Sequence, residues 1–199
     1  MPLLNKLLLM RRNLVLLLCC LLITFPGCKK RETPPPSPRE VCTLITLDDI
    51  QAVQGSPFKE AKSSARSDAG FRVSQCFYTA MEFSRSVNLA LVQTDPSQPT
   101  RRRPKDFWKE KFGRYSGETT EHAGDDKRSE GKEGKEESVR PKKIDGIGEQ
   151  AFWVSNRFGG VLYVLKGDAF ISIGLGGTDD EETKLKKSKA LAQKALQRL

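Results

Sequence analysis

Apolar residues recur over five stretches of the chain in the manner of β-strands. The stretches are residues 71–78, 87–93, 151–155, 161–166 and 169–175. Residues 81–86 join the first two stretches, which predicts an antiparallel hairpin. The short link Gly167–Asp168 predicts that the last two stretches form a tight hairpin within a meander.

Helical spacing of apolar residues appears between strand signals. Residues 46–55 predict a short helix, because Thr46 is a suitable N-cap and Gly55 is a suitable C-terminal stop. A second helix is expected from Pro104, a favoured first helical residue. Its aromatic residues are spaced to share one face: Phe107, Trp108, Phe112 and Tyr115.

The C-terminal residues predict a third helix. Thr178 or Asp179 is expected to cap it, and the acidic residues 180–182 suit the positive end of the helix dipole. An apolar stripe is expected to face the core: Leu185, Ala192, Ala195, Leu196 and Leu199.

These elements predict a single α+β domain over residues 41–199. It should contain one antiparallel sheet of about five strands, with two or three helices packed on it. Between its halves, residues 116–143 are rich in Gly, Ser, Lys and Glu. This composition predicts a disordered, charged insert.

Residues 1–27 differ from the rest and predict a signal peptide that is removed before Cys28. They contain no acidic residue, begin with a basic region and continue into the apolar run 14–25. About 12 apolar residues are too few to cross a bilayer, which needs about 20. An uncleaved membrane anchor is the alternative. Residues 28–40, rich in Pro and basic residues, predict an extended tether.

The formal net charge of +9 favours anionic neighbours, such as lipid headgroups, acidic glycans or nucleic acid. Export makes nucleic acid an unexpected partner. Two of the five cysteines, Cys19 and Cys20, leave with the signal peptide. If Cys28 is acylated, Cys42 and Cys76 remain as a pair in an oxidising compartment, where a disulfide is the default expectation.

The segment Phe25-Pro26-Gly27-Cys28 resembles the lipobox of bacterial lipoproteins. Gly27 and Cys28 fit that pattern, whereas Phe25 and Pro26 differ from its usual residues. The resemblance implies that Cys28 carries fatty acyl chains such as palmitate and anchors the protein in a membrane. Lys29 after the cysteine implies the outer membrane, facing the periplasm, where two membranes exist. With one membrane it implies the outer face of the cell membrane.

A second resemblance covers residues 41–199. Residues 42–46 (Cys-Thr-Leu-Ile-Thr), then Cys76-Phe77-Tyr78, then residues 146–151 (Gly-Ile-Gly-Glu-Gln-Ala) resemble a bacterial lipoprotein family known only as a domain of unknown function. Glu149 stands where that family has Asp. The resemblance implies a Cys42–Cys76 disulfide and a surface lipoprotein, and it implies no activity.

No residue set predicts catalysis, a metal or a cofactor. Residues 146–151 formally match a dinucleotide-binding fingerprint, but a strand follows where a helix is required, so a turn is the better interpretation. His122, the only histidine, lies in the charged insert and offers no ordered base. The acidic residues 179–182 are explained by the start of a helix.

The most suggestive surface is the segment 101–115, where cations interleave with four aromatic residues. Such a helix could lie on anionic headgroups or hold an acidic polymer. The favoured interpretation buries the aromatic rings and leaves the cations in water. The candidate cations are Arg101, Arg102, Arg103, Lys105, Lys109, Lys111 and Arg114.

The leading hypothesis is therefore a non-enzymatic, lipid-anchored envelope protein. It would bind another envelope protein, or an amphiphilic ligand between its sheet and helices. Two alternatives stay open: an envelope hydrolase using carboxylates on the strands, and a basic surface module for anionic lipid or glycan.

Overall fold

The computed structural model describes residues 39–68, 70–97, 103–116 and 140–199, all within one compact unit, Pro36–Leu199. Cys28, Arg101, Arg102 and His122 lie outside the described residues. So do the signal peptide, nearly all of the predicted tether and most of the predicted insert.

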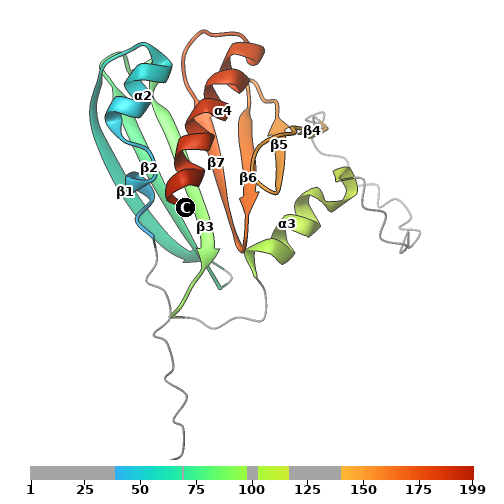
Figure 1. The fold of residues 1–199 in the computed structure, drawn as a ribbon. Coiled ribbons are helices and arrows are strands. Elements are labelled where there is room, and N and C mark those ends of the chain that lie inside the picture. The colour runs from blue at the N-terminus through green and yellow to red at the C-terminus, as the bar shows by residue number, and fades with distance from the viewer. Residues whose placement is uncertain (1–38, 69, 98–102, 117–139) are drawn as a thin grey trace, which may run out of the picture. The chain divides into compact units, whose positions relative to one another are not determined.

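One antiparallel sheet of seven strands dominates this unit (Figure 1). Its strands are β1 (Phe58–Asp68), β2 (Phe71–Ala80), β3 (Val87–Thr94), β4 (Lys142–Lys143), β5 (Gln150–Val154), β6 (Val161–Lys166) and β7 (Ala169–Leu175). Their spatial order is β1-β2-β3-β7-β6-β5-β4. The predicted α+β class, the hairpin β2–β3 and the meander β5–β6–β7 are confirmed.

The predicted count of about five strands was too low by the two edge strands. All residues of β1 from Lys59 to Asp68 are exposed, so the strand has no buried face to produce an alternating pattern. The short strand β4 begins inside the predicted insert, with Lys142 paired to Trp153 and Lys143 paired to Phe152. The predicted insert 116–143 therefore extended too far at its C-terminal end.

The described residues form three α-helices: α2 (Leu47–Gln54), α3 (Pro104–Phe112) and α4 (Glu181–Arg198). Short 3₁₀ turns are η1 (Val41–Thr43), η2 (Phe83–Arg85) and η3 (Gly113–Tyr115). None of the helices in this part of the chain is long and apolar enough to cross a membrane.

The helix ends follow the predicted capping chemistry, with one correction. Thr46 and Asp49 form a reciprocal capping box at the start of α2, and Gly55 ends it at φ 67°. The N-cap of α4 is Asp180 rather than Thr178 or Asp179. Asp180 is extended, and its carboxylate accepts a hydrogen bond from the Thr183 backbone N–H at 2.7 Å.

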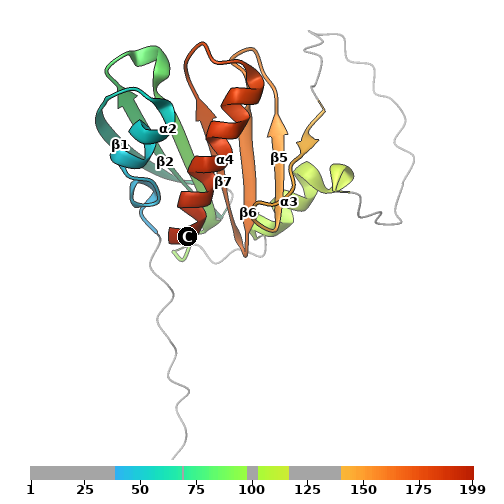
Figure 2. The same cartoon turned by 45° about the horizontal axis from the view of Figure 1, so that its top comes forward.

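The helices cover the two faces of the sheet unequally (Figure 1 and Figure 2). Helices α2 and α4 and the turn η1 pack on one face, here called the inner face, through the larger core cluster. Helix α3 packs on the opposite, outer face through a second cluster. The outer cluster consists of Trp108, Phe112, Phe152, Leu165 and Phe170.

Candidate functional site: the open half of the outer sheet face

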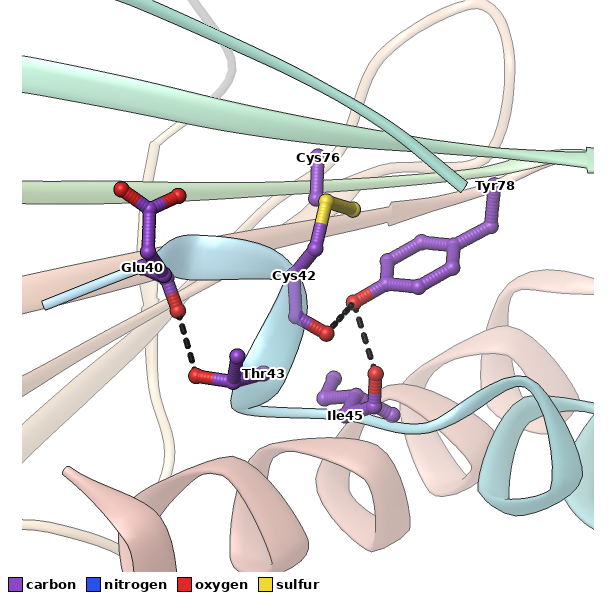
Figure 3. The surroundings of a disulfide bond; sticks show 6 residues. All are labelled: Glu40, Cys42, Thr43, Ile45, Cys76 and Tyr78. Atoms are coloured by element: carbon purple, nitrogen blue, oxygen red, sulfur yellow. Dashed lines mark hydrogen bonds between the residues drawn. A yellow bond between two sulfur atoms is a disulfide. The ribbon is translucent and has the colours of Figure 1, made fainter. Parts of the chain in front are cut away.

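The cysteine pair forms a structural clamp on the inner face (Figure 3). Cys42 in η1 and Cys76 in β2 form a disulfide, with their Cα atoms 5.2 Å apart. Tyr78, two residues further along β2, donates its hydroxyl to the Ile45 carbonyl at 2.9 Å. Burial raises the pKa of Tyr78 above its ordinary value, so the phenol stays a donor. The Cys-x-Tyr motif thus fastens η1 to the sheet.

The glycine motif before β5 is also structural. Gly146 and Gly148 have φ values of 80° and 60°, and they form the predicted turn. A Cβ on Gly148 would lie 2.5 Å from the Leu165 carbonyl oxygen. Glu149 accepts the Gly167 backbone N–H at 2.6 Å, and this hydrogen bond lowers the pKa of Glu149. The motif therefore joins two turns.

The candidate basic surface follows α3 and η3. Trp108 and Phe112 are each 1 % exposed, which agrees with the interpretation that buries these rings. Lys105 is partly exposed and contacts Glu149 at 3.1 Å. The remaining described cations of the segment are exposed: Arg103, Lys109, Lys111 and Arg114.

The strands offer little for carboxylate catalysis. Of the described strands, only β1 carries acidic residues, Glu60 and Asp68. Eight residues of strand separate them by about 26 Å, well beyond the separation of a carboxylate pair that acts on one bond. Among the described residues, no three His, Cys, Asp or Glu side chains lie together as a metal would require.

The outer face is covered by a helix over only part of its width. The aromatic rings of α3 contact rings at two ends of this covered part. The ring centroid of Phe107 lies 5.9 Å from that of Phe71, at the start of β2. The ring centroid of Phe112 lies 4.8 Å from that of Phe152, in β5. Beyond this part, most outer-face residues of β1, β2 and β3 are exposed or half-buried, although Ala90 in β3 is buried. We call this region the open face; it consists of Lys62, Ser64, Arg66, Val73, Gln75, Phe77 and Asn88. Part of it forms a depression of about 260 Å³.

An apolar patch borders the open face at the end of the β2–β3 hairpin. It consists of Phe77, Met81 and Phe83, which are 36 %, 58 % and 70 % exposed. The rings of Phe77 and Phe83 have centroids 6.0 Å apart. These are three of the four exposed large hydrophobic residues in the described part of the chain.

Hydrogen bonds fasten the segment that carries this patch. Met81 N–H donates to the Pro57 carbonyl at 2.9 Å, and Gly176 N–H donates to the Ser86 carbonyl at 2.9 Å. Gln54 donates its amide to the Arg85 carbonyl at 3.1 Å. The backbone beneath Met81 and Phe83 is therefore held, while their side chains stay in solvent.

The fourth exposed hydrophobic residue, Phe158, lies in the β5–β6 turn and is 67 % exposed. The register pairs Val154 with Val161 and Val87 with Leu175, which places this turn and the β2–β3 connection at the same end of the sheet. Lys184, only 5 % exposed, donates to the Phe158 carbonyl at 2.7 Å.

Sequence reasoning missed the open face and the apolar patch. The alternation of β2 predicts that Phe77 faces away from Cys76 and Tyr78, but it cannot show that no described helix covers that face. The residue types of Met81 and Phe83 in a loop were the available signal. Comparison of the chain with protein-family models, with curated proteins and with solved structures finds no match.

Proposed function

We propose that this protein is a lipid-anchored, non-enzymatic protein of the cell envelope that binds another envelope protein on its open face. Acyl chains on Cys28 would hold it in the outer membrane, facing the periplasm, or on the outer face of a single cell membrane. The apolar patch of Phe77, Met81 and Phe83 is the observation that carries the binding proposal.

Exposed apolar side chains that lie together on a small domain are typical of interaction sites. The patch adjoins polar residues of the open face, so an apolar centre would be bordered by hydrogen-bonding groups such as Gln75 and Asn88. Protein–protein interfaces share this arrangement of an apolar centre and a polar rim. Because the backbone under the patch is already held, binding would cost little ordering of the chain.

A protein partner is favoured over an amphiphilic ligand between sheet and helices. That space holds the larger core cluster, whose aliphatic members include Leu89, Ile171, Ile173 and Leu191, all 0 % exposed. A ligand there would have to displace packed side chains. The open face needs no such rearrangement.

Photo-crosslinking in intact cells tests the binding proposal. A photoreactive phenylalanine at Phe77 should capture a defined protein, and the same residue at the exposed position Gln193 on α4 should not. Adding Phe83→Ser should reduce capture from position 77 several-fold, because hydrophobic contact residues dominate such interfaces. Equal capture from position 193, or capture from 77 that ignores Phe83→Ser, would contradict the proposal.

The anchor has its own test. Mass spectrometry of the protein from membranes should find Cys28 as the acylated first residue, and Cys28→Ser should release the protein from membranes. An unmodified N-terminus at Met1 would refute anchoring through Cys28 while leaving the open face untouched.

A basic surface module remains the second candidate, supported by the exposed cations of α3 and η3. The ammonium of Lys111 lies 4.5 Å from the Tyr163 ring centroid, and this cation–π contact holds the cation against the surface of the domain. Binding to vesicles of anionic lipid should then fall steeply with added salt. Binding that is insensitive to salt would exclude this candidate.

A further inference from the structure

The edge strand β1 is long, exposed and paired on one side only. All of its eleven residues except Lys59 pair with β2, and no described strand lies on its other side. A free strand edge presents N–H and C=O groups that can pair with another strand. Proline, short length, charged side chains and bulges are common protections of such an edge. β1 contains no proline, whereas β4 at the opposite edge has only two residues.

The charges of β1 are mixed in sign. On the outer face, Lys62 lies 2.9 Å from Glu60, and Arg66 lies 4.0 Å from Asp68. The side chains that face the other way between them are small: Ala61, Ser63 and Ala65. A strand with this pattern can pair with a second copy of itself without crowding of side chains on the inner face.

We propose that two copies of this chain pair antiparallel through β1, about a two-fold axis at Ser63. In this register, Glu60 of each copy lies opposite Arg66 of the other, and Lys62 lies opposite Ser64. Both Glu60–Arg66 pairs lie on the outer face. Cross-strand pairs of opposite charge stabilise antiparallel sheets.

The neighbouring registers are disfavoured by like charges. In antiparallel pairing only residues on the same face lie opposite each other, so registers about such an axis differ by two residues. One such shift places Lys62 opposite Lys62 of the second copy. The other places Lys62 opposite Arg66 and Glu60 opposite Asp68. The irregularity between Phe58 and Glu60 lies outside the segment Glu60–Arg66 that the proposed register pairs.

This dimer would place the open faces of both copies side by side, because β1, β2 and β3 of each copy adjoin the axis. The proposal does not depend on the proposed function, because sedimentation measures the mass of the assembly whether or not the open face binds a partner. In this dimer, Arg39 of each copy lies on the inner-face side. There the backbone of Arg39 and the side-chain amide of Gln93 exchange two hydrogen bonds at 3.3 Å.

Sedimentation of the full chain, purified from membranes in mild detergent, tests the proposal. Wild type should be a dimer at micromolar concentration. Glu60→Arg and Arg66→Glu should each weaken the dimer about tenfold, because each creates two like-charge pairs. As a control, Gln193→Glu changes an exposed residue of helix α4 and should leave the mass of the dimer unchanged.

Mixing makes the test specific to the register. Glu60→Arg and Arg66→Glu chains, each weakly dimeric alone, should form a stable heterodimer when combined, since both cross-strand pairs regain opposite charges. The doubly swapped chain Glu60→Arg/Arg66→Glu should likewise dimerise as wild type does. A monomeric wild type, a dimer insensitive to both single changes, or a mixture that fails to associate would each overturn the proposal.

Discussion

At the scale of single residues, Asp49 is a carboxylate held by two cations of α4. It contacts Lys194 Nζ at 2.8 Å and Arg198 Nη1 at 2.7 Å, and its side chain is 13 % exposed. The hydrogen bond from Lys194, followed by that from Arg198, holds the pKa of Asp49 well below its ordinary value, against the opposing effect of burial. Asp49 therefore ties α2 to α4.

Asp49→Asn should lower the free energy of unfolding at neutral pH by about 1–3 kcal/mol, because Lys194 and Arg198 lose their anionic partner and one of its two acceptor oxygens. A carboxyl group with a depressed folded pKa stabilises the fold above its unfolded pKa, near 3.9, and loses that contribution as pH falls further. The difference between variant and wild type should therefore shrink between about pH 5 and pH 2.

Urea unfolding at a series of pH values measures this effect. Asp48→Asn is the matched control, since Asp48 is exposed in the same helical turn, and it should change stability by only a few tenths of a kcal/mol. A difference that stays constant from neutral to acid pH would show that the charge of Asp49 does not contribute.

At the scale of elements, the sequence predicted those that bury one face. Strands β6 and β7 were expected at their observed bounds, because Leu162, Val164, Ile171 and Ile173 leave a clear apolar pattern. The strand β1 has no buried face, so only its pairing with β2 makes it a strand. Propensity and alternation cannot reveal an element that exists through its neighbour's backbone.

The candidate site was less predictable than the fold for a related reason. The basic residues of α3 attracted attention because charge is visible in a sequence. Exposure of Phe77 depends on where α3 ends and what it leaves uncovered, which no local pattern contains. The Cys42–Cys76 pairing, in contrast, was predictable, because few cysteines remained to choose from.

The disulfide joins the turn η1 to strand β2, and removing it should loosen the N-terminal part of the inner core. Cys42→Ala/Cys76→Ala should cost about 3–4 kcal/mol, since the bridge closes a loop with a sequence separation of 34 residues. Thermal unfolding of the double variant should match that of the reduced wild-type chain. Tyr78 still holds the Ile45 carbonyl, so the fold should persist at low temperature. A double variant as stable as oxidised wild type would contradict a stabilising role for the bridge.

At the scale of the whole molecule, the two core clusters lie on opposite faces of the same strands. Phe152 belongs to the outer cluster, and its neighbour Trp153 belongs to the inner one. Likewise Phe170 faces α3 while Ile171 faces the inner core. Neither cluster can lose its strands without exposing the other, so the sheet should make both parts of one cooperative unit.

The two tryptophans of the chain allow a direct test, because each cluster contains one: Trp108 in the outer cluster and Trp153 in the inner cluster. Trp153→Phe leaves fluorescence from the α3 side alone, and Trp108→Phe leaves it from the side of α2 and α4. Within each variant, the fluorescence transition in urea should coincide with the transition seen by far-ultraviolet circular dichroism. If the Trp108 signal were instead lost at a lower urea concentration than the secondary structure, α3 would detach from the sheet before the rest of the domain unfolds. The open face would then extend over the part of the sheet that α3 covers whenever the helix detaches, and the proposed binding site would have to include that part.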